Sequence, residues 1–125
     1  MTGKTILIVE DEGLIALHLT EILENAGYHV VDPVYSGEMA LRALEKPPLP
    51  DLILMDIGLA GALDGIETAR QVRQRYPAPL IFVTAYTSES MLARMLEVAP
   101  DAVLIKPFVD SELLALIGKA VGRAT

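Results

Sequence analysis

The sequence predicts an α/β fold in which five parallel strands form one sheet and helices cover both of its faces. Short runs of apolar and β-branched residues alternate along the chain with longer amphipathic stretches, as in a succession of βα units. The short runs are almost continuously apolar, which is typical of a parallel sheet buried on both sides. The chain has no internal repeat, low-complexity tract or linker. We therefore expect residues 1–125 to form one domain with right-handed crossovers.

Each expected element has its own signal in the sequence. The strands are TILIVE (5–10), YHVVDPV (28–34), DLILMD (51–56), PLIFVT (79–84) and DAVLIK (101–106). The helices between them are expected over about 12–26, 36–45, 64–75, 87–98 and 110–121. In the first helix, Ile15, Leu19, Ile22 and Ala26 recur at helical spacing, and Gly27 closes it.

Prolines and capping residues set the boundaries of the other elements. Pro33 places the end of the second strand near a sheet edge. The KPPLP segment (46–50) excludes helix before the third strand. Residues suited to helix capping precede the later helices: the pair Asp64 and Glu67, and Thr87 or Ser88.

Composition excludes several classes of function. The net charge of −7 argues against direct binding of nucleic acid, which needs clustered Lys and Arg. No stretch approaches the roughly 20 consecutive apolar residues of a membrane span. The chain has no cysteine, so it has neither disulfides nor a thiolate metal site, and this suits the cytoplasm.

Charged and hydroxyl residues stand at the carboxyl ends of the expected strands. They are Glu10 and Asp11 after the first strand, Asp56 after the third, Thr84 after the fourth and Lys106 after the fifth. In a parallel sheet, ligands bind outside these ends, where the strand order switches direction. Each residue alone has an ordinary structural explanation, such as helix capping by Asp11. Together they indicate a site, because independent strands bring complementary groups to one edge.

The chemistry of this set favours phosphoryl transfer. Clustered carboxylates repel one another unless a cation lies among them, and Mg²⁺ commonly bridges carboxylates to a phosphoryl group. An aspartate can itself be the nucleophile and form an acyl phosphate. Lys106 would pair with the phosphoryl oxygens and the Thr84 hydroxyl would donate to another. The small residues Gly58 and Ala85 leave room for a donor to approach.

Two other readings of the sequence are weaker. His18 on the first helix would suggest a phosphohistidine, but a helix-bundle transmitter has no βα alternation. Gly58, Gly61 and Gly65 match neither the dinucleotide-binding nor the P-loop pattern.

The ordered motifs ILIVEDE, LILMDI, VTA and KPF resemble the receiver domain of two-component response regulators, over the whole chain. The resemblance implies a flavodoxin-like doubly wound (βα)5 sandwich with strand order 2-1-3-4-5. It implies a cytoplasmic signalling phosphoprotein rather than an enzyme with an external substrate. The implied phosphodonor is a sensor histidine kinase or a histidine phosphotransfer protein, and the output protein or domain is unknown. No direct contact with nucleic acid or membrane is implied. A homodimer would use the face of the fourth helix, fifth strand and fifth helix.

The resemblance also assigns residue roles. Asp56 would be the phosphoacceptor. Mg²⁺ would be held by Asp11, Asp56 and the backbone carbonyl of Gly58, with Glu10 acting through water. Phosphoryl binding and switching would involve Thr84, Ala85, Tyr86 and Lys106, and the peptide bond before Pro107 would be cis.

The chain departs from the family pattern at Val103, where many receivers carry an aromatic residue that turns inward on phosphorylation. Val103 is too small and too stiff for such a movement, so the signal is expected to leave by the loop of Thr84 and Tyr86. Two alternatives stay open. One is a degenerate receiver that acts as a constitutive interaction module. The other is an aspartyl-phosphate phosphatase, although such enzymes need a second acid where this chain has Gly58.

Overall fold

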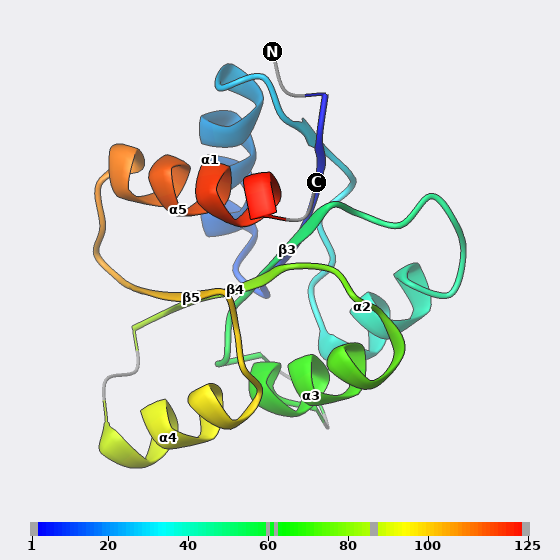
Figure 1. The fold of residues 1–125 in the computed structure, drawn as a ribbon, viewed down its shortest axis with the longest axis vertical. Helices are drawn as coiled ribbons and strands as arrows, with labels where there is room; N and C mark the ends of the chain where they lie inside the picture. Colours follow the sequence, from blue (N-terminus) through cyan, green and yellow to red (C-terminus); the bar gives the residue numbers. More distant parts are fainter. Residues whose placement is uncertain (1–2, 60, 62, 86–87, 124–125) are drawn as a thin grey trace.

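A computed structural model describes residues 3–59, 61, 63–85 and 88–123. Within them, five parallel strands form one sheet in the order β2-β1-β3-β4-β5, and Figure 1 shows helices on both sides of it. The strands are β1 (Thr5–Val9), β2 (His29–Val30), β3 (Leu52–Met55), β4 (Leu80–Thr84) and β5 (Ala102–Ile105). The helices are α1 (Gly13–Asn25), α2 (Gly37–Ala43), α3 (Gly65–Arg75), α4 (Glu89–Glu97) and α5 (Asp110–Arg123). The predicted fold class and strand order are confirmed.

Alternation along the strands divides the apolar core into two layers. Ile6 and Ile8 of β1 pack with α1 and α5 on one face of the sheet. Leu7 and Val9 of the same strand pack with α2, α3 and Met95 of α4 on the other face. Because both faces are covered, the strands are apolar at nearly every position.

The strand register aligns the carboxyl ends that carry the predicted site. β1 pairs with β3 from Ile6 opposite Leu52 to Val9 opposite Met55. The next residues, Glu10 and Asp56, therefore emerge side by side at the same edge of the sheet.

The second strand is shorter than predicted, so the expectation of one strand over 28–34 is wrong. Only His29–Val30 forms β2, and Val34 returns as an isolated bridge to Val9. Pro33 explains the break, because proline has no N–H to donate to a strand ladder. The expected position of this strand at the sheet edge is confirmed.

Side-chain caps start three helices, and two of these caps, Asp64 and Ser88, are among the predicted ones. The Ser36 hydroxyl accepts a hydrogen bond from the Met39 N–H at 3.1 Å, and Asp64 Oδ1 accepts one from Glu67 at 2.8 Å. Ser88 caps α4, and the alternative cap Thr87 lies outside the described residues. The N-cap of α1 is Glu12, not Asp11. Asp11 therefore does not have the capping role that is its ordinary structural explanation.

Helices able to cross a membrane were searched for among the described residues, and none is both long and apolar enough.

Candidate functional site

The structure brings three carboxylates together at the carboxyl edge of the sheet. One carboxylate oxygen from each of Glu10, Asp11 and Asp56 lies within 4.8 Å of the others. The Asp56 N–H donates to the Val9 carbonyl at 3.0 Å, which extends the pairing of β1 with β3 to the acidic residue itself. The cluster therefore rests on two paired inner strands of the sheet, β1 and β3.

Glu10 is the buried member of the cluster, with 1% of its surface exposed. Its Oε1 accepts a hydrogen bond from Lys106 Nζ at 3.1 Å, and its Oε2 accepts one from the Glu12 N–H at 3.1 Å. Burial, and after it the charge of Asp56, raise the pKa of Glu10 to about 6, although the hydrogen bonds from the Glu12 N–H and from Lys106 act to lower it. The carboxylates thus repel one another despite the lysine.

Lys106 reaches this cluster from the end of β5, the edge strand on the other side of β3 and β4. It follows β5, which β3 and β4 separate from β1. Its ion pair with Glu10 therefore carries the ammonium group over the carboxyl ends of β3 and β4. The Lys106–Pro107 peptide bond is cis, as expected from the family pattern.

Asp56 is half-buried and begins the loop between β3 and α3. Its Oδ1 accepts a hydrogen bond from the Gly58 N–H at 3.4 Å, and Gly58 itself is exposed. Gly65 packs so tightly on this turn that a Cβ atom there would lie 1.9 Å from the Asp56 carbonyl oxygen. The sequence did not predict this role of Gly65, because the contact joins backbone atoms at the two ends of a nine-residue loop.

Thr84 ends β4 at the same edge and is fully buried. Its carbonyl accepts a hydrogen bond from the Lys106 N–H at 2.8 Å, which fixes the backbones of these two residues relative to each other. Ala85 is exposed. Tyr86 lies outside the described residues.

The donor set of the cluster fits a hard divalent cation. Three carboxylates supply oxygen ligands, which Mg²⁺ prefers, and the exposed turn at Gly58 leaves space for water in the coordination shell. A cation would also relieve the repulsion that raises the pKa of Glu10. The predicted ligands Glu10, Asp11 and Asp56 are thus brought together.

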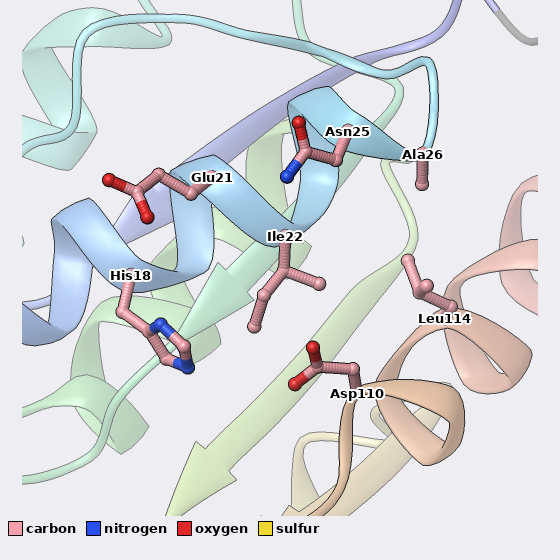
Figure 2. A pocket seen from close by; sticks show the side chains of 7 residues that line it. All are labelled: His18, Glu21, Ile22, Asn25, Ala26, Asp110 and Leu114. Atoms are coloured by element: carbon pink, nitrogen blue, oxygen red, sulfur yellow. The ribbon is translucent and has the colours of Figure 1, made fainter.

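A separate pocket of about 330 Å³ lies between α1 and α5 (Figure 2). It is lined by His18, Glu21, Ile22, Asn25, Ala26, Asp110 and Leu114. His18 is exposed and belongs to no group of metal-ligating side chains among the described residues. The pocket shares no residue with the acidic cluster, so it is not part of that site.

A family model and a curated relative both match most of this chain. A family model for the response regulator receiver domain matches residues 6–118. The transcriptional regulatory protein PdtaR of Mycobacterium tuberculosis is 34% identical over 120 residues, which are 96% of this chain and 58% of PdtaR. The chain therefore spans little more than half the length of that relative.

Two solved structures are similar along nearly their whole length. The signal receiver domain of a modulated diguanylate cyclase from Desulfovibrio desulfuricans G20 has a TM-score of 0.89 and 37% identity, covering 98% of this chain and 96% of that one. The receiver domain of sensor histidine kinase PA1611 from Pseudomonas aeruginosa PAO1 has a TM-score of 0.86 and 31% identity, covering 97% and 99%. That structure has a magnesium ion coordinated in its active site cleft.

Proposed function

The chain belongs to the response regulator receiver domain family, and from this premise we propose that Asp56 is its phosphoacceptor. The observation that carries the proposal is the convergence of Glu10, Asp11, Asp56 and Lys106 on one edge of the sheet. Among the acids, Glu10 is buried and held by two hydrogen bonds, whereas Asp56 stands beside the exposed Gly58. Burial thus argues against Glu10, while Asp11 and Asp56 are both half-buried. The choice of Asp56 rests on its match to the phosphoacceptor position of the family motif.

In the proposed reaction, an Asp56 carboxylate oxygen attacks the phosphorus of a phosphohistidine. The new O–P bond forms as the P–N bond breaks, and the donor imidazole leaves with the electron pair. Mg²⁺, when bound, neutralises charge on the transferring phosphoryl group. Asp11, Asp56 and the Gly58 carbonyl would hold it, with Glu10 acting through water.

Lys106 and the end of β4 would bind the phosphoryl oxygens. The Lys106 ammonium group has three N–H donors, so it can keep its bond to Glu10 and still donate to a phosphoryl oxygen. The Thr84 hydroxyl would donate to another oxygen, and Ala85 leaves that side open. Movement of Thr84 toward the phosphoryl group would shift the start of α4, and so change the α4–β5 face for an output protein or domain.

Exposed apolar side chains near the site residues in the chain are compatible with a protein phosphodonor. Leu14 and Leu17 of α1 follow Asp11, Val109 follows Lys106, and all three are large and exposed. We propose that they contribute to a protein contact. We assign it to a sensor histidine kinase or histidine phosphotransfer protein of the cytoplasm.

A regulatory role without an external substrate is favoured over both alternatives. A phosphatase acting through Asp56 would need a second acid at position 58, where the chain has an exposed glycine. A degenerate receiver would not need the acidic cluster and Lys106 together.

The test is labelling by a small phosphodonor. With Mg²⁺ and acetyl phosphate, intact-mass analysis should show one added phosphoryl group, and Asp56→Asn should abolish it. The matched control is Asp32→Asn, at an exposed aspartate outside the acidic cluster, which should label normally. Equal labelling of Asp56→Asn and the wild type would disprove the assignment.

A further inference from the structure

Helix α4 is held to the rest of the fold by few contacts. Of its nine residues only Met95 is buried, and Val98 is buried just beyond its end. Leu92 and Leu96 are exposed. Figure 1 shows this helix at the periphery of the molecule. A single polar contact can therefore matter more to the position of α4 than to that of a helix with a wide buried face.

Among the described residues, the ion pair that joins α4 to another helix is Arg94 with Asp64. Arg94 Nη2 lies 3.2 Å from Asp64 Oδ2. The other carboxylate oxygen of Asp64 accepts the capping hydrogen bond of α3, from the Glu67 N–H at 2.8 Å. The Asp64 carboxylate thus caps α3 and also forms an ion pair with α4.

Asp64 is in turn fixed to the backbone of the acidic site. The next residue, Gly65, donates its N–H to the Ile57 carbonyl at 3.0 Å and packs directly on the Asp56 carbonyl. The connection from Arg94 to Asp56 therefore consists of one ion pair and one backbone junction. This junction holds Asp64 in place, so a movement of α4 away from the start of α3 would strain or break the ion pair.

We propose that the Arg94–Asp64 ion pair is a latch that holds α4 against the start of α3 and opposes the rearrangement of α4 on phosphorylation. This rests on the proposed function of Asp56. The latch acts by the general rule that a contact made in one of two arrangements favours that arrangement. Its strength is limited, because both side chains are about two-fifths exposed and solvent screens such pairs.

Two single substitutions and their combination test the latch. Arg94→Gln removes the cation. Asp64→Asn removes the anion and keeps the cap of α3, because asparagine caps helices as well as aspartate does. Arg70→Gln is the matched control: it breaks the Arg70–Glu67 pair inside α3, whose exposed fractions of 41% and 37% match the 42% and 38% of Arg94 and Asp64.

The first readout is amide exchange over residues 89–97 in metal-free buffer. Arg94→Gln and Asp64→Asn should each speed exchange there about two- to fivefold, the range that exposed ion pairs contribute. The second is the beryllofluoride concentration that half-saturates the protein in excess Mg²⁺, followed by NMR shifts of α4 amides. It should fall by a similar factor in both variants.

The double variant should match the single variants, since either substitution already breaks the pair. Unchanged exchange and affinity in both single variants would overturn the latch, as would additive effects in the double variant or an equal effect of Arg70→Gln. If wild-type Asp56 does not label, the proposed function fails instead. The exchange readout needs no phosphate and still decides whether the pair holds α4.

Discussion

At the scale of single residues, Glu10 is a carboxyl group whose ionised form is destabilised by its surroundings. It is almost wholly buried, and its pKa is raised from 4.5 to about 6, first by burial and then by the charge of Asp56. Such a group would be costly in a domain that needed only stability. Glu10 lies beside Asp11 and Asp56. A cation bound among these carboxylates would attract all three and so offset their mutual repulsion.

The raised pKa predicts how stability depends on pH in metal-free buffer. Below pH 4.5 Glu10 is protonated in both the folded and the unfolded chain, so it costs nothing. As the pH rises from 4.5 through 6, the unfolded chain loses this proton first, and the free energy of unfolding falls by about 2 kcal/mol. Above pH 6 the penalty stays constant.

Urea unfolding of the wild type and of Glu10→Gln from pH 4.5 to 7 isolates this contribution from other titrating groups. The difference between the two proteins should change by about 2 kcal/mol over this range, and saturating Mg²⁺ should reduce the change. A difference that does not vary with pH would contradict the prediction.

At the scale of elements, the junction of β3 with α3 determines where Asp56 stands. Gly65 begins α3 directly against the backbone of Asp56 and Ile57. Both neighbours are main-chain atoms, so neither can turn aside for a larger side chain. Gly65→Ala should destabilise the fold by about 3 kcal/mol, as overpacking against backbone does, and should slow labelling of Asp56.

Gly118→Ala is the control for this substitution. Gly118 lies inside α5 with no atom near the position of an added Cβ, so alanine there should stabilise the protein by about 0.5–1 kcal/mol. Urea unfolding measures both variants. Equal stability of the two would show that the close packing at Gly65 is unimportant.

The sequence predicts these elements unevenly. Strands and the capping by Asp64 follow from local patterns of apolar and polar residues, whereas the strand order was implied by the resemblance to the receiver family. The early end of β2 depends on a single proline and was missed. The partner of Asp64 was also missed, because Arg94 lies 30 residues away and an exposed arginine on a helix has no distinguishing pattern.

The sequence also predicts the site only in part: its residues were predicted, but one of their contacts was not. Glu10, Asp11, Asp56 and Lys106 were predicted together because parallel strands deliver their carboxyl ends to one edge. The ion pair of Lys106 with Glu10 was not predicted, since it depends on how far one side chain reaches across two strands.

At the scale of the whole molecule, large exposed apolar side chains occur on two sets of elements. Leu14, Leu17 and Val109 lie on α1 and just before α5. Leu92, Leu96 and Ile105 lie on α4 and the edge strand β5. We propose that the first receives the phosphodonor and the second receives the output partner or a second copy of the chain. Phosphorylation would then couple two contacts that do not overlap.

We predict that activation allows a homodimer to form through the α4–β5–α5 face. Three exposed apolar side chains are few for a stable dimer, which buries about 1,200–2,000 Å², so association should depend on the rearrangement of α4. Sedimentation should show a monomer–dimer shift when Mg²⁺ and beryllofluoride are added.

Two leucines on different helices make this prediction specific. Leu96→Asp on α4 should abolish the shift, because it places a charge within the proposed interface. Leu14→Asp on α1 should keep it, since Leu14 is even more exposed but belongs to the other set of exposed apolar side chains. Both substitutions are at exposed positions and should leave the fold intact. A dimer that forms equally in Leu96→Asp, or that Leu14→Asp alone abolishes, would move the interface away from α4.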